Sequence, residues 1–372
     1  MFLSHLLFVW LTVVFFISGL LINLVQFCVL PLYWVHRKLY RILISKLCYC
    51  LYSDFTFLAE WWGTTNLTVY AEDDVLKQMQ HEKIIAILNH YSDVDWLIGW
   101  VFAERIGVLG SVKVAMKHGI QYVPTLGWAW WFAEFTFLKR NWQTDKDHLM
   151  KTMKGLKNHK IPYAMTLFCE GTRRTEDKLK ASQEYAIQNN MKPLKHHLVP
   201  RAKGFSMMIH ELYHEVPAVY DLEFAFPNPE KCTIVNLINR GKVDVHLHIR
   251  RIPISDIPTS SIEETSAYCQ LLYQQKDELY EHFVKHGEFP GKKVALERGI
   301  WNFVTLSCHN VIVFVVLLTL LKHCVYLFGP VFTTSFLVLL GISVFALVKM
   351  LLRVTQTHKG SSFGLKHEKK EK

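Results

Sequence analysis

Residues 84–100, IIAILNHYSDVDWLIGW, place a short apolar run before a longer one, with a polar loop between them. The run IIAIL is typical of a buried strand, which ends where the loop begins. Ser92 or Asp93 is a suitable N-cap for a helix over residues 94–105. The sequence therefore predicts a strand, a loop and a helix in immediate succession.

Short apolar runs and longer amphipathic ones alternate through the centre of the chain. Alternation of this kind favours an α/β fold in which helices flank a sheet. Polar and apolar residues alternate over Val243–Ile249, which is typical of an edge strand or a half-exposed one. Strands are predicted at residues 83–88, 111–115, 134–138, 163–168, 218–224 and 242–250, and helices at 94–105, 145–156, 176–189, 205–214 and 261–284.

Three apolar stretches point to a membrane protein. The chain has 372 residues, of which 51% are hydrophobic and 20% charged, against about 25% charged in an average soluble domain. Residues 1–35 contain no Asp, Glu, Lys or Arg, and residues 300–321 and 325–348 are also apolar. A helix rises about 1.5 Å per residue, so each stretch is long enough for a hydrocarbon core about 30 Å thick.

These stretches divide the chain into four parts. Residues 1–35 are predicted to form an N-terminal membrane anchor, because a cleaved signal peptide has a basic start and a shorter apolar run. Gly19 and Pro31 leave open whether the anchor spans the bilayer once or lies in it. A central domain (36–299), a C-terminal transmembrane hairpin (300–350, turning at residues 322–324) and a basic tail (351–372) follow.

Basic residues flank the apolar stretches and predict the orientation. Arg37, Lys38, Arg41 and Lys46 follow the first stretch, Lys292, Lys293 and Arg298 precede the second, and Lys349, Arg353 and Lys359 follow the third. All lie in the cytoplasm if the central domain and the tail are cytoplasmic. The net charge of +10 suits a domain beside anionic headgroups and substrates, or records only this bias.

The end of the chain predicts a compartment. Lys369, Lys370 and Lys372 resemble the dilysine retrieval signal of endoplasmic reticulum membrane proteins, and the alternative is a solvated lysine-rich tail. We therefore expect a multi-pass protein of the endoplasmic reticulum membrane with its central domain in the cytoplasm.

His90 and Asp95 are the first candidate catalytic pair. On one continuous helix, residues five apart lie about 140° apart around the axis. They can meet only if His90 precedes the helix and Asp95 lies in its first turn, as the strand-loop-helix prediction provides. Asp95 would then accept a hydrogen bond from one ring nitrogen and leave the other as a general base. The alternative is a capping aspartate and a loop histidine that only satisfy the local backbone.

A second candidate site follows the predicted strand at 163–168. Residues 168–173, FCEGTR, leave the sheet at a strand end, where open α/β sheets bind their ligands. Gly171 permits close approach of a ligand, and Arg173 offers a planar fork for phosphate. Glu170 would orient Arg173 or hydrogen-bond the acceptor. The alternative is a surface turn with a salt bridge.

One further motif suggests a metal. Residues 210–214, HELYH, match the His-Glu-x-x-His pattern of metalloproteases on a predicted helix. The next histidine, His246, lies in a predicted strand, so no third ligand is evident. We therefore expect no metal site.

Taken together, NHYSDVD and FCEGTR resemble the His-x4-Asp and Glu-Gly-Thr-Arg motifs of the glycerolipid acyltransferases, which include the lysophosphatidic acid acyltransferases. Two more blocks match family motifs in order: FLKR at 137–140 and VPAVYD at 216–221. PRAKGF at 200–205 resembles a further family block, with Ala202 in place of the usual Thr. The resemblance extends from Ser18 through the tail and is closest to animal 1-acylglycerol-3-phosphate acyltransferases of the gamma and delta type, which share the C-terminal hairpin.

The resemblance implies a fold with a mixed sheet and an activity. The expected reaction is acyl-CoA-dependent acylation of the free hydroxyl of 1-acylglycerol-3-phosphate, giving phosphatidic acid, with His90 as base and Asp95 orienting it. Acyl-CoA is a co-substrate, no cofactor is implied, and the partners are the lysophospholipid acceptor and membrane lipids, not nucleic acid. The implied substrate-binding residues are Arg140, Glu170, Gly171, Thr172, Arg173 and Lys203.

Two other functions stay open. The motifs match the phosphate and glycerol that lysophospholipids share, so the acceptor could be lysophosphatidylinositol or lysocardiolipin. A non-enzymatic membrane scaffold with the same fold is the other alternative, although His90, Asp95, Glu170 and Arg173 are all intact.

Overall fold

An eight-stranded mixed sheet forms the centre of the protein. The structure is a computed structural model that describes residues 2–139, 141–157 and 159–355. The strands lie in the order β4-β3-β5-β2-β6-β7-β1-β8; the first five are parallel, β7 and β1 run the opposite way, and β8 is antiparallel to β1. Their bounds are β1 Thr64–Tyr70, β2 Ile84–Leu88, β3 Val112–Lys117, β4 Thr136–Leu138, β5 Ala164–Leu167, β6 Ala218–Ala225, β7 Lys242–Pro253 and β8 Lys293–Val294.

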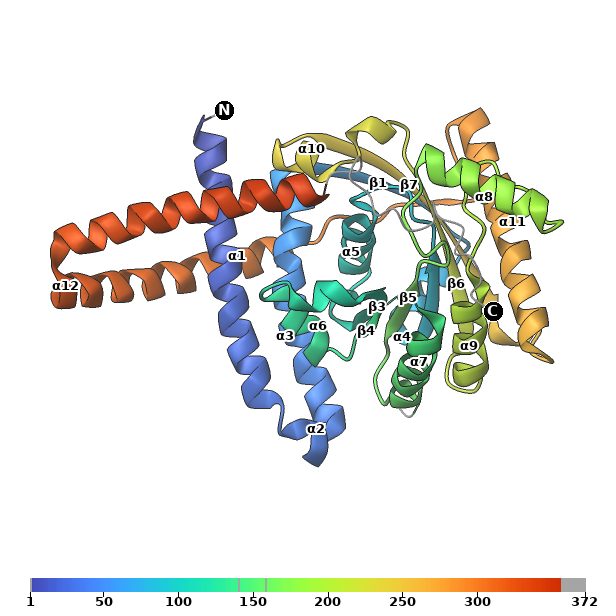
Figure 1. The fold of residues 1–372 in the computed structure, drawn as a ribbon, viewed down its shortest axis with the longest axis horizontal. Helices are drawn as coiled ribbons and strands as arrows, with labels where there is room; N and C mark the ends of the chain where they lie inside the picture. The colour runs from blue at the N-terminus through green and yellow to red at the C-terminus, as the bar shows by residue number, and fades with distance from the viewer. Residues whose placement is uncertain (1, 140, 158, 356–372) are drawn as a thin grey trace.

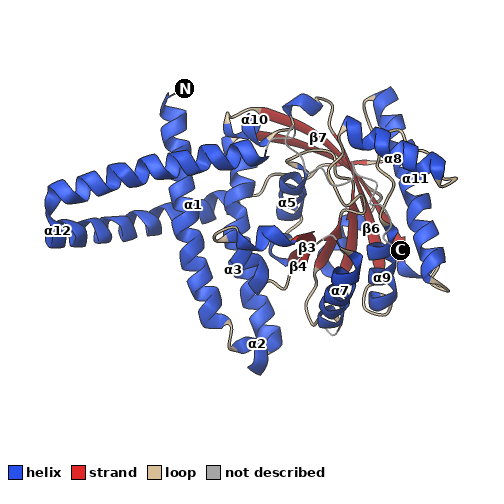
Figure 2. Ribbon diagram, viewed as in Figure 1, coloured by secondary structure: helices blue, strands red, loops and turns tan. Residues whose placement is uncertain are grey.

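Helices cover both faces of the sheet (Figure 2), so the predicted α/β fold with a mixed sheet and flanking helices is confirmed. Side chains of a strand alternate between its two faces. Ile84 and Ala86 of β2 therefore pack into one apolar core with α3, α5 and α6, whereas Ile85 and Ile87 pack into a second core with α7, α9 and α11. These helices are α3 Arg37–Phe57, α5 Asp95–Arg105, α6 Leu126–Phe132, α7 Trp142–Leu156, α9 Ala202–Leu212 and α11 Ile262–His286.

Most predicted elements are present, and the differences are local. β7 alternates between buried and half-buried residues as expected, but it lies between β6 and β1 and is therefore not an edge strand. The sequence analysis missed β1 and β8, whose runs are short or largely polar. The helix predicted at 176–189 is α8 (Glu176–Gln188). The short helices α4 (Val75–His81), α6 and α10 (Ile234–Ile238) were not predicted.

Three described helices are long and apolar enough to cross a membrane: Leu6–Val29, Arg37–Trp62 and Trp301–Ser343. The first and last lie in the predicted anchor and hairpin, within α1 (Phe2–Val29) and α12 (Trp301–Thr355). The middle one, formed by α3 and its π-helical extension, was assigned to the central domain by the sequence analysis. After the short α2 (Leu32–Val35), α3 returns beside α1, and the two arms of α12 run across this pair (Figure 1).

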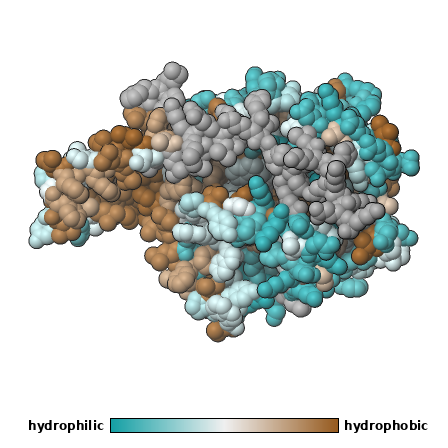
Figure 3. Space-filling view, viewed as in Figure 1, coloured by the Kyte–Doolittle hydropathy of each residue, from teal (hydrophilic) through white to brown (hydrophobic). Residues whose placement is uncertain are grey.

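The turn of the C-terminal hairpin lies at Gly329 and Pro330, not at residues 322–324 as the sequence analysis predicted. Lys322 and His323 do not break the helix, since isolated polar residues leave its backbone hydrogen bonds intact. At Gly329 the backbone has a φ of 79°, which glycine adopts without strain, and Pro330 has no N–H to continue the helix. Both arms are covered by apolar side chains (Figure 3).

Polar side chains attach the first arm of α12 to the other apolar helices. His309 Nδ1 lies 3.0 Å from Asp54 Oδ1 of α3, and Trp10 Nε1 of α1 donates to Asn310 Oδ1 at 2.7 Å. Asn302 accepts a hydrogen bond from Trp61 at 2.9 Å. In an apolar environment such side chains need partners, so these contacts fix the position of the first arm.

Gly110 allows α3 to pack directly on the central domain. A Cβ atom at Gly110 would lie 2.2 Å from the carbonyl oxygen of Ser45. We expect Gly110→Ala to lower the free energy of unfolding by about 1–3 kcal/mol, because overpacking forces the backbone apart. Thermal unfolding of the detergent-purified protein measures the change.

Gly119→Ala is the matched control, because nothing lies within 4 Å of a Cβ atom there. Equal melting temperatures for the two variants would contradict the tight contact between α3 and Gly110.

Candidate active site

A cavity of about 1750 Å³ runs from the apolar helices to the ends of the central strands. At one end it is lined by the apolar side chains Phe8, Leu11, Phe15, Phe55 and Leu306. His90 lies along it, and four cations line its other parts: Lys117, Lys178, Arg201 and Lys203. The cavity can therefore hold a molecule that is apolar at one end and anionic at the other.

Several cavity residues follow the carboxyl ends of neighbouring parallel strands. His90 comes after β2, the loop 168–174 comes after β5, and Lys117 is the last residue of β3. Because these strands are parallel, their carboxyl ends meet at one edge of the sheet, where ligands of α/β proteins bind. The fold thus gathers residues that are far apart in the sequence.

His90 and Asp95 form the predicted contact. His90 Nδ1 lies 2.8 Å from Asp95 Oδ2, with His90 before α5 and Asp95 as its first residue. The Asp95 side chain is fully buried, whereas 26% of the His90 side chain is exposed. With Nδ1 engaged, Nε2 is the ring nitrogen left to exchange a proton with a molecule in the cavity.

The start of α5 differs from the prediction, because neither Ser92 nor Asp93 caps the helix. The Asp95 carboxylate turns back and accepts the N–H of Ser92 at 3.1 Å. The Ser92 hydroxyl donates to the carbonyl of Cys232 and accepts the N–H of Val94. The loop is thus tied to Asp95, which holds the carboxylate in place beside His90.

The loop after β5 holds both backbone groups of His90. Glu170 Oε1 accepts the N–H of His90 at 2.9 Å, and the N–H of Arg174 donates to the carbonyl of His90 at 2.8 Å. The second carboxylate oxygen of Glu170 accepts the N–H of Leu198 at 3.2 Å. The sequence analysis expected Glu170 to orient Arg173 or bind the acceptor, but both of its oxygens hold backbone amides instead.

The remaining predicted residues of this loop lie in different surroundings. Gly171 has a φ of 69°, and a Cβ atom there would lie 2.8 Å from Cδ of Arg201, so the glycine makes room for a side chain of the protein. Thr172 accepts a hydrogen bond from Lys178 at 2.7 Å. Both residues line the cavity.

Arg173 lies beside Asp93. Burial raises the pKa of the Asp93 carboxyl, and the charge of Arg173 opposes this effect. Nε of Arg173 is buried without a hydrogen-bond partner among the described residues. Gly171 and Thr172 line the cavity but Arg173 does not, so the predicted phosphate contact of Arg173 is not part of the cavity wall.

Of the other two predicted cations, Lys203 lies on α9 and lines the cavity, with its Nζ 5.7 Å from the ring centre of Trp142. Arg140 lies outside the described residues. The sequence analysis missed Lys117, Lys178 and Arg201 as cavity residues. Arg201 lies in the PRAKGF block and could have been noticed, whereas nothing in the sequence marks Lys117 as part of a site.

The His-Glu-x-x-His residues make ordinary contacts. His210 Nε2 lies 3.0 Å from the hydroxyl of Thr265, and Glu211 forms an ion pair with Lys157. Within the described ranges, no group of three or more His, Cys, Asp or Glu side chains is arranged to hold a metal ion.

Comparison with known proteins gives a consistent result. Residues 66–226 match the family model described as Acyltransferase, and residues 236–309 match the one described as Acyltransferase C-terminus. The chain is 36% identical over 360 residues to 1-acyl-sn-glycerol-3-phosphate acyltransferase gamma of Mus musculus, covering 96% of this chain and 95% of that protein. It is 36% identical over 363 residues to the delta protein of the same organism, covering 98% and 95%.

A solved structure is also similar. The 1-acyl-sn-glycerophosphate acyltransferase PlsC from Thermotoga maritima aligns with a TM-score of 0.43 at 17% identity, over 71% of this chain and 97% of that one.

Proposed function

The chain belongs to the acyltransferase family of the 1-acyl-sn-glycerol-3-phosphate acyltransferases gamma and delta, and we propose that it acylates 1-acylglycerol-3-phosphate with acyl-CoA to give phosphatidic acid. The observation that carries the proposal is the contact between His90 and Asp95 in a cavity with an apolar end and cations. Both substrates have an apolar chain and at least one phosphate group. The apolar lining suits the chains, and the cations suit the phosphates.

In the proposed mechanism, Nε2 of His90 takes the proton of the acceptor hydroxyl. The oxygen attacks the thioester carbonyl carbon, the carbon–sulfur bond breaks, and the leaving thiolate of CoA receives the proton from His90. General base catalysis of this kind contributes about 10²–10⁴-fold. The buried carboxylate of Asp95 fixes the tautomer of His90 and stabilises the imidazolium. The cavity, about 1750 Å³ in volume, has room for donor and acceptor together, so no acyl-enzyme is needed.

Phosphate binding is assigned to the cations near the strand ends. Lys203 lines the cavity. Arg173 lies in the loop that holds His90, and its role as a phosphate ligand rests on the resemblance of its motif. Gly171 and Thr172 line the cavity. Glu170 acts through His90, whose backbone N–H it accepts. Arg140 is retained as a phosphate ligand on the resemblance of its motif alone.

The protein is associated with membranes through its apolar helices. We place it in the endoplasmic reticulum with the catalytic domain in the cytoplasm, because the basic residues Arg37, Lys38 and Lys292 flank the apolar stretches in the sequence. The lysines at 369, 370 and 372, which support this compartment, lie outside the described residues.

A panel of acceptors tests the proposed function. Purified protein in detergent is given labelled oleoyl-CoA with lysophosphatidic acid, lysophosphatidylinositol or lysocardiolipin, and CoA release and labelled product are measured. We expect the fastest transfer to lysophosphatidic acid, and none by the His90→Ala variant. Transfer only to another lysophospholipid would contradict lysophosphatidic acid as the acceptor. Full activity of His90→Ala would refute His90 as the general base.

Asp95→Asn tests the orientation of His90. The amide cannot hold the same tautomer, so we expect kcat to fall by about 10²–10⁴-fold with a nearly unchanged KM for the acceptor. Asp244→Asn is the control, since that carboxylate pairs with Lys242 and Asn66 on the far part of the sheet. A kcat within twofold of the unaltered protein would remove Asp95 from the mechanism.

Lys203→Ala tests the anionic end of the cavity. A hydrogen bond to a charged group contributes about 1.5–3 kcal/mol, so we expect the acceptor KM to rise roughly tenfold or more while kcat changes little. Lys285→Ala, an exposed lysine paired with Glu281 at the end of α11, is the control. An unchanged acceptor KM in Lys203→Ala would exclude a phosphate contact by this lysine.

A further inference from the structure

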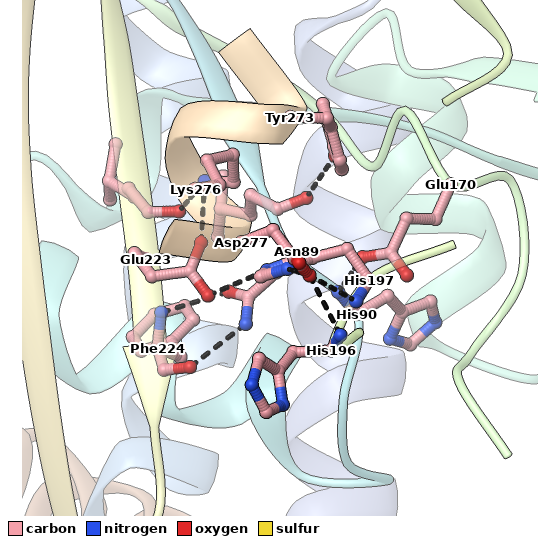
Figure 4. A network of polar contacts seen from close by, with 12 residues as sticks. Asn89, His90, Glu170, His196, His197, Glu223, Phe224, Tyr273, Lys276 and Asp277 are labelled. Carbon is pink, nitrogen blue, oxygen red and sulfur yellow. Dashed lines mark hydrogen bonds and ion pairs between the residues drawn. The ribbon is translucent and has the colours of Figure 1, made fainter. Parts of the chain in front are cut away.

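A buried cluster of charges lies behind the loop that holds His90 (Figure 4). It connects β6, α11 and the segment 195–198, and none of the motifs explains it as a whole. Lys276 Nζ lies 2.7 Å from Asp221 and 2.9 Å from Glu223. The other two members, His197 and Asp277, are also buried. We call these five residues, Asp221, Glu223, His197, Lys276 and Asp277, the buried charge cluster.

His197 is the member that faces the active site, and it carries a positive charge. Its Nε2 lies 2.8 Å from Glu223 Oε1 and its Nδ1 3.1 Å from Asp277 Oδ1. Both nitrogens must hold a proton to satisfy two carboxylates, which makes the ring an imidazolium. Burial alone would lower the pKa of His197, but Glu223 and Asp277 raise this pKa to about 10. The charge is therefore present at neutral pH.

A short chain of contacts leads from His197 to His90. Asp277 accepts the backbone N–H groups of Lys195, His196 and His197, so the cluster fixes the whole segment. The next residue, Leu198, donates its N–H to Glu170 Oε2, and the other oxygen of Glu170 accepts the N–H of His90. One peptide unit and one carboxylate thus separate the buried imidazolium from the proposed base.

We propose that His197 is a positioning residue for acyl transfer: its buried positive charge keeps Glu170 as a carboxylate that holds the backbone of His90 in place. This inference deepens the proposed function and rests on it for its activity measurement. It gives a role to a residue outside the motifs that the sequence marks.

The physical reason lies in the two hydrogen bonds that Glu170 accepts. An ionised carboxylate accepts an N–H strongly on each oxygen, whereas protonation turns one oxygen into a donor and a weaker acceptor. Burial raises the pKa of Glu170, and the charge of His197 is the largest influence opposing that rise, followed by the N–H groups of His90 and Leu198. Without the imidazolium, Glu170 would take up a proton at higher pH and release one of its two partners.

Other titratable groups also face these two side chains. The ring of His90 favours ionised Glu170, as His197 does. Tyr273 of α11 donates its hydroxyl to the carbonyl of Leu88 and stays neutral, because burial raises its pKa. Tyr280 of the same helix packs against His197 and has its pKa raised by burial as well. These tyrosines carry no charge in the working range, so His197 is the group whose removal changes Glu170 most.

The pH dependence of kcat/KM tests the proposal with His197→Gln. Full activity needs a neutral His90 and an ionised Glu170, so the part of the acidic limb that Glu170 sets is lost as the pH falls through the pKa of Glu170. Loss of a nearby opposite charge shifts a carboxyl pKa by about one unit or more, so we expect the part of the acidic limb set by Glu170 to move to higher pH. The rate on the acidic limb should then fall below that of the unaltered protein at the same pH, while the alkaline plateau is retained. His197→Lys keeps the positive charge, so the acidic limb of its pH profile should lie where it does in the unaltered protein.

His159→Gln is the matched control, because His159 is as buried as His197 and, among the described residues, its ring donates to the carbonyl of Ile161 and pairs with no carboxylate. It should lower thermal stability and leave the acidic limb unchanged. In a Glu170→Gln background, His197→Gln should shift the limb no further, since its effect passes through Glu170. Superimposable limbs for His197→Gln and the unaltered protein, or an equal shift in His159→Gln, would contradict the proposal.

The test also works if the His197→Gln variant does not fold or if the unaltered protein is inactive. If His197→Gln does not fold, His197→Lys carries the test alone, and a displaced limb in that variant counts against the role of the charge. If the unaltered protein transfers acyl groups to no acceptor, the proposed function fails separately. Modification of His90 by diethyl pyrocarbonate, mapped by mass spectrometry across pH, then tests the positioning: faster modification of His90 in His197→Gln at acidic pH supports it, and equal rates refute it.

Discussion

The whole site depends on how the backbone of His90 is held. The carboxylate of Glu170 accepts its N–H, and the N–H of Arg174 donates to its carbonyl. These residues lie 80 positions or more from His90 in the chain, but β2 and β5 are parallel neighbours and bring their carboxyl ends together. The two motifs therefore act as one unit: the first supplies the imidazole and its carboxylate, and the second fixes where the imidazole stands.

The position of this unit explains how one cavity can serve two unlike ends of a lipid. The apolar helices α1, α3 and α12 provide one end of the cavity, and the strand ends provide its cations. α3 belongs to both parts, because it is apolar enough to meet a membrane and also packs into the core beside α5. A lipid could thus keep its chains among the apolar helices while its phosphate and hydroxyl reach His90.

Local patterns in the sequence made much of the fold and part of the candidate site predictable. The buried run at 84–88, the polar loop and the helix after it led directly to the contact between His90 and Asp95, because only a break between strand and helix lets residues five apart meet. Contacts between distant segments could not be predicted in this way. Nothing near Glu170 in the sequence indicates that its oxygens hold His90 and Leu198, and the buried charge cluster joins three separate segments. The helix α3 was missed because its basic and polar residues hide an apolar face, and the hairpin turn was misplaced because polar residues were taken as breaks.

The most direct test of this account is an experimental structure in lipid nanodiscs with lysophosphatidic acid and an unreactive acyl-CoA analogue bound. The account predicts that Nε2 of His90 lies within hydrogen-bond distance of the acceptor hydroxyl, while Glu170 still bridges the backbone amides of His90 and Leu198. A hydroxyl bound far from His90, or a Glu170 carboxylate turned toward the ligand, would contradict it.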